Sequence, residues 1–117
     1  MLSAQSAAMD VVADLAANVE VSDVQQKQIT DIEKKFFKDW KEISTLKETN
    51  PDVYYNKLSY LKEVKMGEVT DLLTEKQLTA YRTYRKGKSV ERAAMYKKLK
   101  AEGVPSREIK IKMMEEL

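Results

Sequence analysis

Apolar residues that recur at steps of three and four are the feature that most constrains the fold. This spacing places them on one face of an α-helix, because a helix turns once every 3.6 residues. The clearest stripe comprises Ile29, Ile32, Phe36, Trp40, Ile43 and then Leu46 or Lys47. A second stripe comprises Tyr54, Leu58, Leu61, Val69 and Leu72 and is interrupted by Lys65. Asn50 and Pro51 precede the second stripe. Asn is favoured as a helix N-cap and Pro in the first helical turn, so these two residues mark the start of the second helix. We predict two long helices here, paired as an extended antiparallel hairpin.

Glycine and proline total only five in 117 residues, which argues against a β-sandwich or a barrel. We therefore predict an all-α fold, a single helical domain over 1–117. It would have a short N-terminal helix within 1–20, core helices over 22–86 and a helical tail over 88–117. Inside these bounds we expect shorter helices at about 7–17, 75–86 and 90–101, and another from Arg107 onward. Gly103 would close the helix before it, and Ser106 would cap the last one.

The chain has neither cysteine nor histidine. Disulfides, thiol nucleophiles, zinc fingers, Ser-His-Asp triads and Glu-x-x-His di-iron sites are therefore excluded. The nearest acidic pairs, Asp10 with Asp14 and Glu115 with Glu116, come without a glycine-rich loop or a third ligand. We interpret them as solvated charges. The sequence predicts no catalytic residue, no metal site and no cofactor, so we expect a binding protein rather than an enzyme.

Charge is unevenly distributed although 21 basic and 19 acidic residues leave a net charge of only +2. The segment from Lys76 to Lys100 contains nine basic residues and only one acid, Glu91. The first twenty residues contain three acids and no base. No apolar run approaches the roughly 20 residues that span a bilayer. Residues 1–8 also lack the basic opening and apolar block of an intact signal peptide.

Two helix starts share one pattern of residues. They are Val21-Ser22-Asp23-Val24-Gln25 and Leu73-Thr74-Glu75-Lys76-Gln77. In each, the hydroxyl of Ser22 or Thr74 can accept a hydrogen bond from the amide three residues on. The Gln25 or Gln77 side chain can then reach back to the amide of the capping residue. The sequence therefore predicts two capping boxes about fifty residues apart.

This pairing of motifs resembles the LTXXQ-motif family of Spy and CpxP-like periplasmic proteins. Residues 73–77 fit the motif at every defined position, and residues 21–25 replace its Leu and Thr by Val and Ser. The resemblance covers about Met9 to Lys86. It implies helical hairpins that assemble into a cradle-like homodimer, which by symmetry we expect to be two-fold. It also implies a periplasmic location, with the export signal removed.

The family implies one of two related roles. Spy-like members hold unfolded or partly folded proteins without ATP on a face that combines positive charge and apolar patches. CpxP-like members restrain a sensor kinase of the envelope stress response. Metal-binding relatives use histidines, which this chain lacks. The sequence leaves chaperone and stress adaptor both open.

Several residues are candidates for contact with such a client. Phe37 lies about 100° from the centre of the first stripe, and Tyr60 points away from the second. Tyr55 and Met66 lie on another flank of the same helix. Arg82, Arg85 and Lys86 would supply the positive face. The alternative for each is an amphipathic side chain that rests on a neighbouring helix.

Nucleic-acid binding is the rival interpretation of the basic segment 76–100. Lysine and arginine can neutralise phosphates while tyrosines stack on bases, and Tyr81, Tyr84 and Tyr96 are interleaved with them. However, Tyr81 and Tyr84 are three residues apart on the face that we predict to be buried. Binding to a membrane surface is a third alternative, which the scattered acids disfavour.

Overall fold

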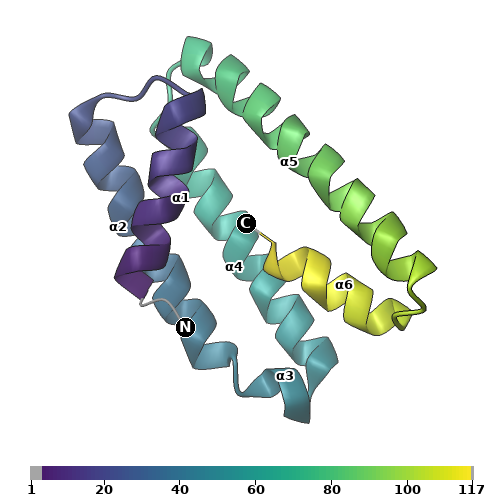
Figure 1. Ribbon diagram of the computed structural model, residues 1–117. Helices are drawn as coiled ribbons and strands as arrows, with labels where there is room; N and C mark the ends of the chain where they lie inside the picture. Colours follow the sequence, from purple (N-terminus) through teal and green to yellow (C-terminus); the bar gives the residue numbers. More distant parts are fainter. Residues whose placement is uncertain (1–3, 117) are drawn as a thin grey trace.

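The computed structural model describes residues 4–116, which form six helices with no strand among them (Figure 1). The helices are α1 (Ala4–Asn18), α2 (Asp23–Ile43), α3 (Leu46–Thr49), α4 (Pro51–Asp71), α5 (Glu75–Ala101) and α6 (Ser106–Glu115). The prediction of an all-α fold is confirmed. The ends of the predicted N-terminal segment and tail, at 1–3 and 117, lie outside the described residues.

The hairpin of α2 and α4 is the centre of the fold. The two helices contact each other and run in opposite directions, joined by the single turn of α3 (Figure 1). α1 packs along α2, and α6 contacts both α4 and the far end of α5. The predicted hairpin with flanking helices is therefore present. α5 leaves the body after its first turns and α6 brings the chain back.

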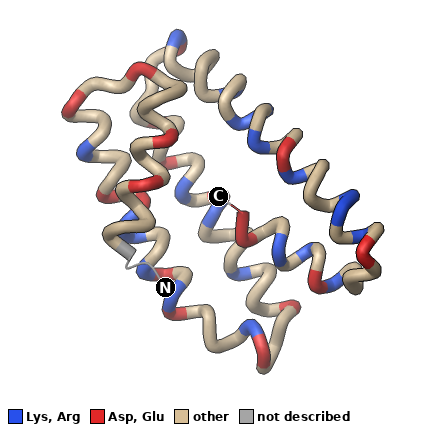
Figure 2. The backbone as a smooth tube through the Cα atoms, in the orientation of Figure 1, with Lys and Arg blue, Asp and Glu red and all other residues tan. Residues whose placement is uncertain are grey.

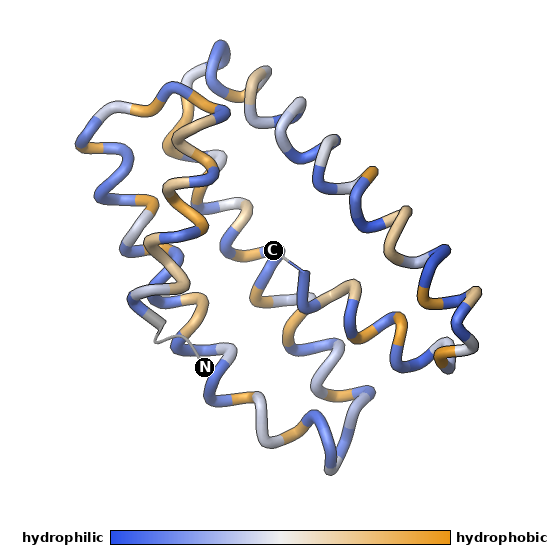
Figure 3. Tube along the Cα trace, viewed as in Figure 1, coloured by the Kyte–Doolittle hydropathy of each residue, from blue (hydrophilic) through white to orange (hydrophobic). Residues whose placement is uncertain are grey.

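Two apolar clusters fill the core. The first comprises Ala8, Phe36, Phe37, Tyr54, Leu58 and Ile111. The second comprises Val12, Leu15, Val19, Ile29, Val69 and Leu73. Figure 3 shows apolar positions recurring along α1, α2 and α4, the helices that supply most of both clusters. Complete burial of such a side chain stabilises the fold by roughly 1.5–3 kcal/mol.

Both capping boxes are present at the starts of α2 and α5. Ser22 Oγ accepts from the Gln25 amide at 3.1 Å, and Gln25 Oε1 accepts from the Ser22 amide at 2.9 Å. In the second box, Thr74 Oγ1 accepts from the Gln77 amide at 3.3 Å, and Gln77 Oε1 accepts from the Thr74 amide at 2.9 Å. Each box satisfies two amides that the first turn of a helix leaves without partners.

The two boxes are also bonded to each other. Gln25 Nε2 donates to Gln77 Oε1 and Gln77 Nε2 donates to Gln25 Oε1, both at 2.8 Å. The remaining protons go to backbone carbonyls, from Gln25 to Leu72 at 2.9 Å and from Gln77 to Glu20 at 2.8 Å. Both side-chain amides thus use all their donors and acceptors. This amide pair ties the start of α2 to the start of α5.

The prediction of two helices over 75–86 and 90–101, with the tail starting at 88, is wrong. α5 continues without interruption from Glu75 to Ala101. Gly87 lies inside this helix and keeps a helical backbone. A single exposed glycine costs a helix only about 1 kcal/mol relative to alanine, which a helix of 27 residues tolerates.

The end of α5 follows the prediction, whereas the start of α6 does not. Gly103, with φ of 80°, donates to the Lys100 carbonyl, and Val104 donates to that of Leu99, both at 3.1 Å. These two bonds form a Schellman motif. Pro105, not Ser106, occupies the capping position of α6, and it makes no side-chain cap bond. Pro105 has an extended backbone, with ψ of 143°, and Ser106 is the first helical residue.

Candidate binding cleft

A cleft of about 110 Å³ opens between α5 and the body formed by α1, α2 and α4, and this cationic cleft is the candidate functional site. Five bases line it, Lys62 and Lys65 of α4 and Arg85, Lys88 and Arg92 of α5, against the two acids Glu33 and Glu116. Its apolar wall comprises Val11, Leu15, Met66 and Val69, with the rings of Tyr81 and Tyr84. The cleft therefore combines an excess of positive charge with an apolar surface.

Helical spacing explains why these side chains meet. On α5 the cleft residues recur at steps of three and four from Tyr81 to Arg92, so they share one face. On α4 the same spacing runs from Lys62 to Val69. Figure 2 shows lysine and arginine recurring along the length of α5. Of the basic residues in segment 76–100, only Arg85, Lys88 and Arg92 line the cleft.

A buried ion pair lies at the base of the cleft. Lys65 Nζ is 3.4 Å from Glu33 Oε2, and the Glu33 side chain is only 5% exposed. Lys65 Nζ also lies 4.3 Å from the centre of the Phe36 ring. Burial raises the pKa of Glu33 and lowers that of Lys65, and their mutual attraction opposes both shifts. Glu33 Oε2 accepts no hydrogen bond from any described residue.

Lys62 stands at the other end of the cleft, beside the end of α6. Its ammonium group donates to the carbonyls of Met114 at 2.8 Å and Glu116 at 2.6 Å. Burial, and then the positive charges of Lys65 and Arg92, lower the pKa of Lys62 to about 8. The neighbouring cations therefore lower the pKa of Lys62 more than Glu116 raises it.

A polar contact between α1 and α5 fixes one border of the cleft. The Tyr84 hydroxyl donates to Asp14 Oδ2 at 2.6 Å, and Lys88 Nζ lies 3.0 Å from the same oxygen. The Tyr84 bond and then the Lys88 bond lower the pKa of Asp14. Burial, followed by the bond to Asp14, raises the pKa of Tyr84. These contacts hold α5 beside α1 where the cleft begins.

We expect Tyr84→Phe to lower the free energy of unfolding by about 1 kcal/mol, measured by urea denaturation. The substitution removes one hydrogen bond to a carboxylate that is partly exposed, so water replaces most of the lost interaction. Tyr60→Phe is the matched control, because Tyr60 is 65% exposed. Equal stability losses in the two variants would contradict the role given to the Tyr84 hydroxyl.

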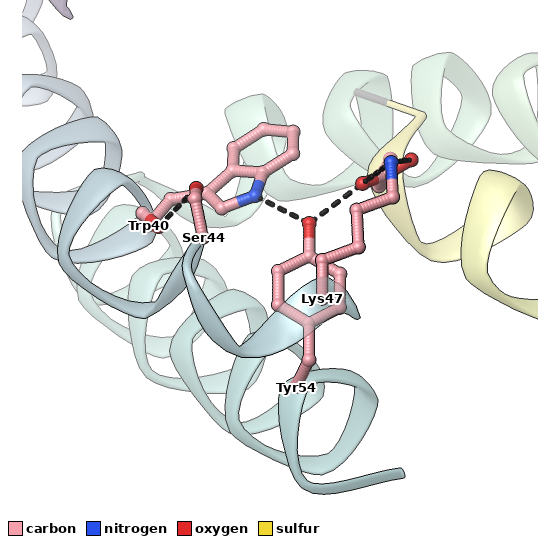
Figure 4. Close-up of polar contacts among 5 residues, drawn as sticks. Trp40, Ser44, Lys47 and Tyr54 are labelled. Atoms are coloured by element: carbon pink, nitrogen blue, oxygen red, sulfur yellow. Dashed lines mark hydrogen bonds and ion pairs between the residues drawn. The ribbon is translucent and has the colours of Figure 1, made fainter. Parts of the chain in front are cut away.

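A second polar network anchors α6 to the hairpin (Figure 4). Trp40 Nε1 donates to the Tyr54 hydroxyl at 2.9 Å, and that hydroxyl donates to Glu115 Oε2 at 2.6 Å. Lys47 Nζ lies 2.9 Å from the same carboxylate oxygen. Burial and the bond to Glu115 raise the pKa of Tyr54 to about 12. Glu115, interpreted from the sequence as a solvated charge, is therefore a structural anchor.

The structure brings only Met66 and Arg85 of the seven predicted client-binding residues into the cleft. Arg82 and Lys86 are exposed elsewhere on α5. Tyr60 is exposed, as expected from its position on α4. Tyr55 is half-buried, with Lys110 Nζ 4.1 Å from the centre of its ring.

The expectation that Phe37 is left over for a partner is wrong. Phe37 is 9% exposed and belongs to the first core cluster, with ring centroids 5.3 Å from Phe36 and 5.9 Å from Trp40. The reason is that α1 and α4 both pack on α2. The buried arc of α2 is therefore wider than one stripe, and Ala8 of α1 belongs to the same cluster as Phe37.

Sequence reasoning missed Glu33, Lys62 and Arg92 as parts of the site. A signal for Glu33 was available, because it lies four residues after Ile29 and three before Phe36, within the apolar stripe. Lys65 similarly interrupts the stripe of α4. Opposite charges inside the facing stripes of two paired helices indicate a buried ion pair. No comparable signal marks Lys62 and Arg92, whose proximity depends on the angle at which α5 leaves the hairpin.

Comparisons with known proteins add no family to this description. No protein-family model matches the chain, and neither the curated proteins nor the solved structures gave a match. Within residues 4–116, no three acidic side chains gather as metal ligands. Over the same range, no helix is both long and apolar enough to cross a bilayer.

Proposed function

We propose that this protein is an ATP-independent periplasmic chaperone or envelope-stress adaptor of the Spy and CpxP type, which binds non-native proteins. The observation that carries the proposal is the cationic cleft, where five bases adjoin an apolar wall. Such a surface suits polypeptide segments that expose apolar and acidic side chains together. Its field attracts acidic chains before contact, most strongly at low salt.

The local architecture supports the proposed kinship. Two LTXXQ-like boxes begin two helices and meet through the amide pair, so both motifs serve one junction. The resemblance rests on these two motifs, and here they occupy corresponding positions in the fold. Ser22, Gln25, Thr74 and Gln77 are therefore structural residues under this proposal.

Exposed apolar side chains outside the cleft are further candidates for contact with a client. Tyr60 of α4 and Val90 of α5 are 65% and 64% exposed, and Tyr96 is exposed as well. An open groove beside Tyr60 is lined by Ile43, Val53 and Leu61. Isolated apolar residues are common on protein surfaces. Tyr60 and Val90 lie on the faces of α4 and α5 opposite the cleft residues, so they would provide separate positions for weak contact with unfolded chains.

A homodimer is part of the proposal. None of the described residues of α5 is buried, although the helix has 27 residues. Most helices in proteins owe their stability to packing of an apolar face, so a long helix with no fully buried residue gains from a partner. A two-fold arrangement that places α5 of one protomer near the other would form a cradle. Sedimentation equilibrium measures this state directly.

We expect equimolar protein to suppress the aggregation of several unfolded client proteins at low salt, measured by light scattering without ATP. Arg85→Gln with Arg92→Gln should reduce the protection, because both changes remove charge from the cleft. Lys27→Gln with Lys38→Gln is the matched control, since both lysines are exposed on α2. If the wild-type protein leaves the aggregation of every client unchanged, the chaperone role is wrong.

Nucleic acid fits the same surface less well. Tyr81 and Tyr84 are half-buried, and the Tyr84 hydroxyl is engaged by Asp14. Arg85 and Lys88 lie over these two rings at 5.9 and 5.6 Å from their centres. The rings are therefore poorly placed to stack on bases. Binding to single strands with a salt dependence of about 0.7 per phosphate contact would favour nucleic acid instead.

A further inference from the structure

The cationic cleft differs in character between its two ends. Because α4 and α5 are consecutive and joined by a tight turn, Val69 and Tyr81 lie at the end nearest that turn. Met66, Leu15 and Val11 add to the apolar wall. Lys62 and Arg92 lie at the opposite end, where Arg92 contributes to the lowered pKa of Lys62. A ligand therefore meets an apolar surface at one end and cations at the other.

Part of the positive charge in the cleft has no acidic partner among the described residues. Lys65 is paired with Glu33 and Lys88 with Asp14. Arg85 and Arg92 form no ion pair with any other residue in the range 4–116. Guanidinium groups bind carboxylates through two parallel hydrogen bonds, so these two arginines are suited to a planar anion.

The size and the acids of the cleft limit which anion fits. About 110 Å³ admits a carboxyl group with a few carbon atoms rather than a nucleotide or a whole peptide. Glu33 and Glu116 repel a doubly charged phosphate more strongly than a singly charged carboxylate. The apolar wall also stabilises methylene groups, which inorganic phosphate lacks.

We propose that the cleft binds the side chain of a glutamate from an extended client polypeptide. Its methylene groups would rest against Met66 and Val69, and its carboxylate would lie between Lys62, Arg85 and Arg92. This inference rests on the proposed function, because it names what the cleft recognises in a non-native protein. It gives the protein a preference for acidic segments over neutral ones of the same shape.

Two short peptides test the proposal, Ac-Ala-Leu-Glu-Leu-Ala-amide and the same peptide with glutamine in place of glutamate. We expect the glutamate peptide to bind the full-length protein at least about tenfold more tightly in isothermal titration calorimetry, since the two arginines need an anion. Butyrate, which has the same kind of stem, should compete with it, and inorganic phosphate at equal concentration should not. Equal binding of the two peptides, or competition by phosphate as strong as that by butyrate, would overturn the proposal.

Proton uptake provides an independent readout. A carboxylate beside Lys62 raises the pKa of that ammonium group above about 8. At pH 8 we therefore expect the complex to take up a fraction of a proton, detected by calorimetry in buffers with different ionisation enthalpies. At pH 6 Lys62 is already charged and uptake should vanish. Binding without uptake at pH 8 would place the peptide elsewhere.

Matched variants separate the cleft from the general charge of α5. Arg85→Gln with Arg92→Gln should weaken the glutamate peptide by about tenfold or more. Arg82→Gln with Lys86→Gln removes the same charge from exposed positions of the same helix and should change affinity less than threefold. Equal losses of affinity in the two double variants would show that the glutamate peptide does not bind in the cleft. If the protein suppresses aggregation but binds both peptides equally, the glutamate site is wrong while the chaperone role stands. If it prefers the glutamate peptide but does not suppress aggregation, the chaperone role is wrong while the glutamate site stands.

Discussion

Lys65→Met is expected to destabilise the protein by about 3–4 kcal/mol at pH 7, although methionine fills nearly the same space. The substitution leaves Glu33 buried without its counter-ion, and an unpaired buried charge is strongly destabilising. The carboxyl group can escape the penalty by taking up a proton. From its ordinary pKa of 4.5, this costs about 3.4 kcal/mol at pH 7, at 1.36 kcal/mol per pH unit. Urea denaturation of the variant and the wild type measures the difference.

The pH dependence identifies the cause of this loss. In the variant the folded pKa of Glu33 is raised above the unfolded value, so the folded state binds the extra proton. Stability therefore falls as pH rises from about 4.5 to 7, and the deficit relative to the wild type should shrink at pH 5.

Two comparison variants separate charge from packing. Glu33→Gln with Lys65→Met removes both charges and should recover most of the loss. Lys57→Met, at an exposed position of α4, should change stability by less than about 0.5 kcal/mol. A double variant no more stable than Lys65→Met alone would show that packing, not charge, is responsible.

Gln25→Glu is expected to destabilise the protein by about 2–3 kcal/mol. Glutamate serves as well as glutamine in an isolated capping box, and its charge favours a helix N-terminus. In this protein, however, Gln25 Nε2 also donates to the Leu72 carbonyl and to Gln77 Oε1. A carboxylate cannot donate, so two hydrogen bonds are lost and oxygen atoms face one another. Thermal or urea unfolding measures the change.

The neighbouring variant Gln26→Glu is the control for Gln25→Glu. It introduces the same charge into the same helical turn at an exposed position and should be neutral or slightly stabilising. Lowering the pH should relieve the Gln25→Glu defect, because a protonated carboxyl group regains a donor. Unchanged stability of Gln25→Glu would mean that the two boxes act independently of each other.

The local features of this fold could be predicted because they depend on neighbouring residues. Apolar spacing predicts α2 and α4, and the chemistry of Ser22 and Thr74 predicts both boxes. The bond between Gln25 and Gln77 could not be predicted, since each glutamine alone satisfies its own box. The burial of Phe37 depends on two helices packing on α2 at once. The predicted break between 86 and 90 contains Gly87, which the long helix α5 accommodates.

The cleft was harder to predict than the helices. The sequence indicates that segment 76–100 is basic but not which of its cations face α4. Met66 could be named because it lies off the main apolar stripe of α4, and Arg85 because it belongs to the basic segment. Lys62 and Arg92 could not, because their neighbourhood depends on how far α5 diverges and where α6 returns.

The amide pair also constrains the order of folding. It joins residues 52 positions apart, so closing that loop costs about 3.5 kcal/mol of free energy in lost chain entropy before any bond forms. The bonds within each box span three residues and can form as fast as a helical turn. The pair can therefore close only after α2 and α4 have come together. Its contribution then falls mainly on the unfolding rate, so the junction prolongs the lifetime of the native state more than it hastens folding.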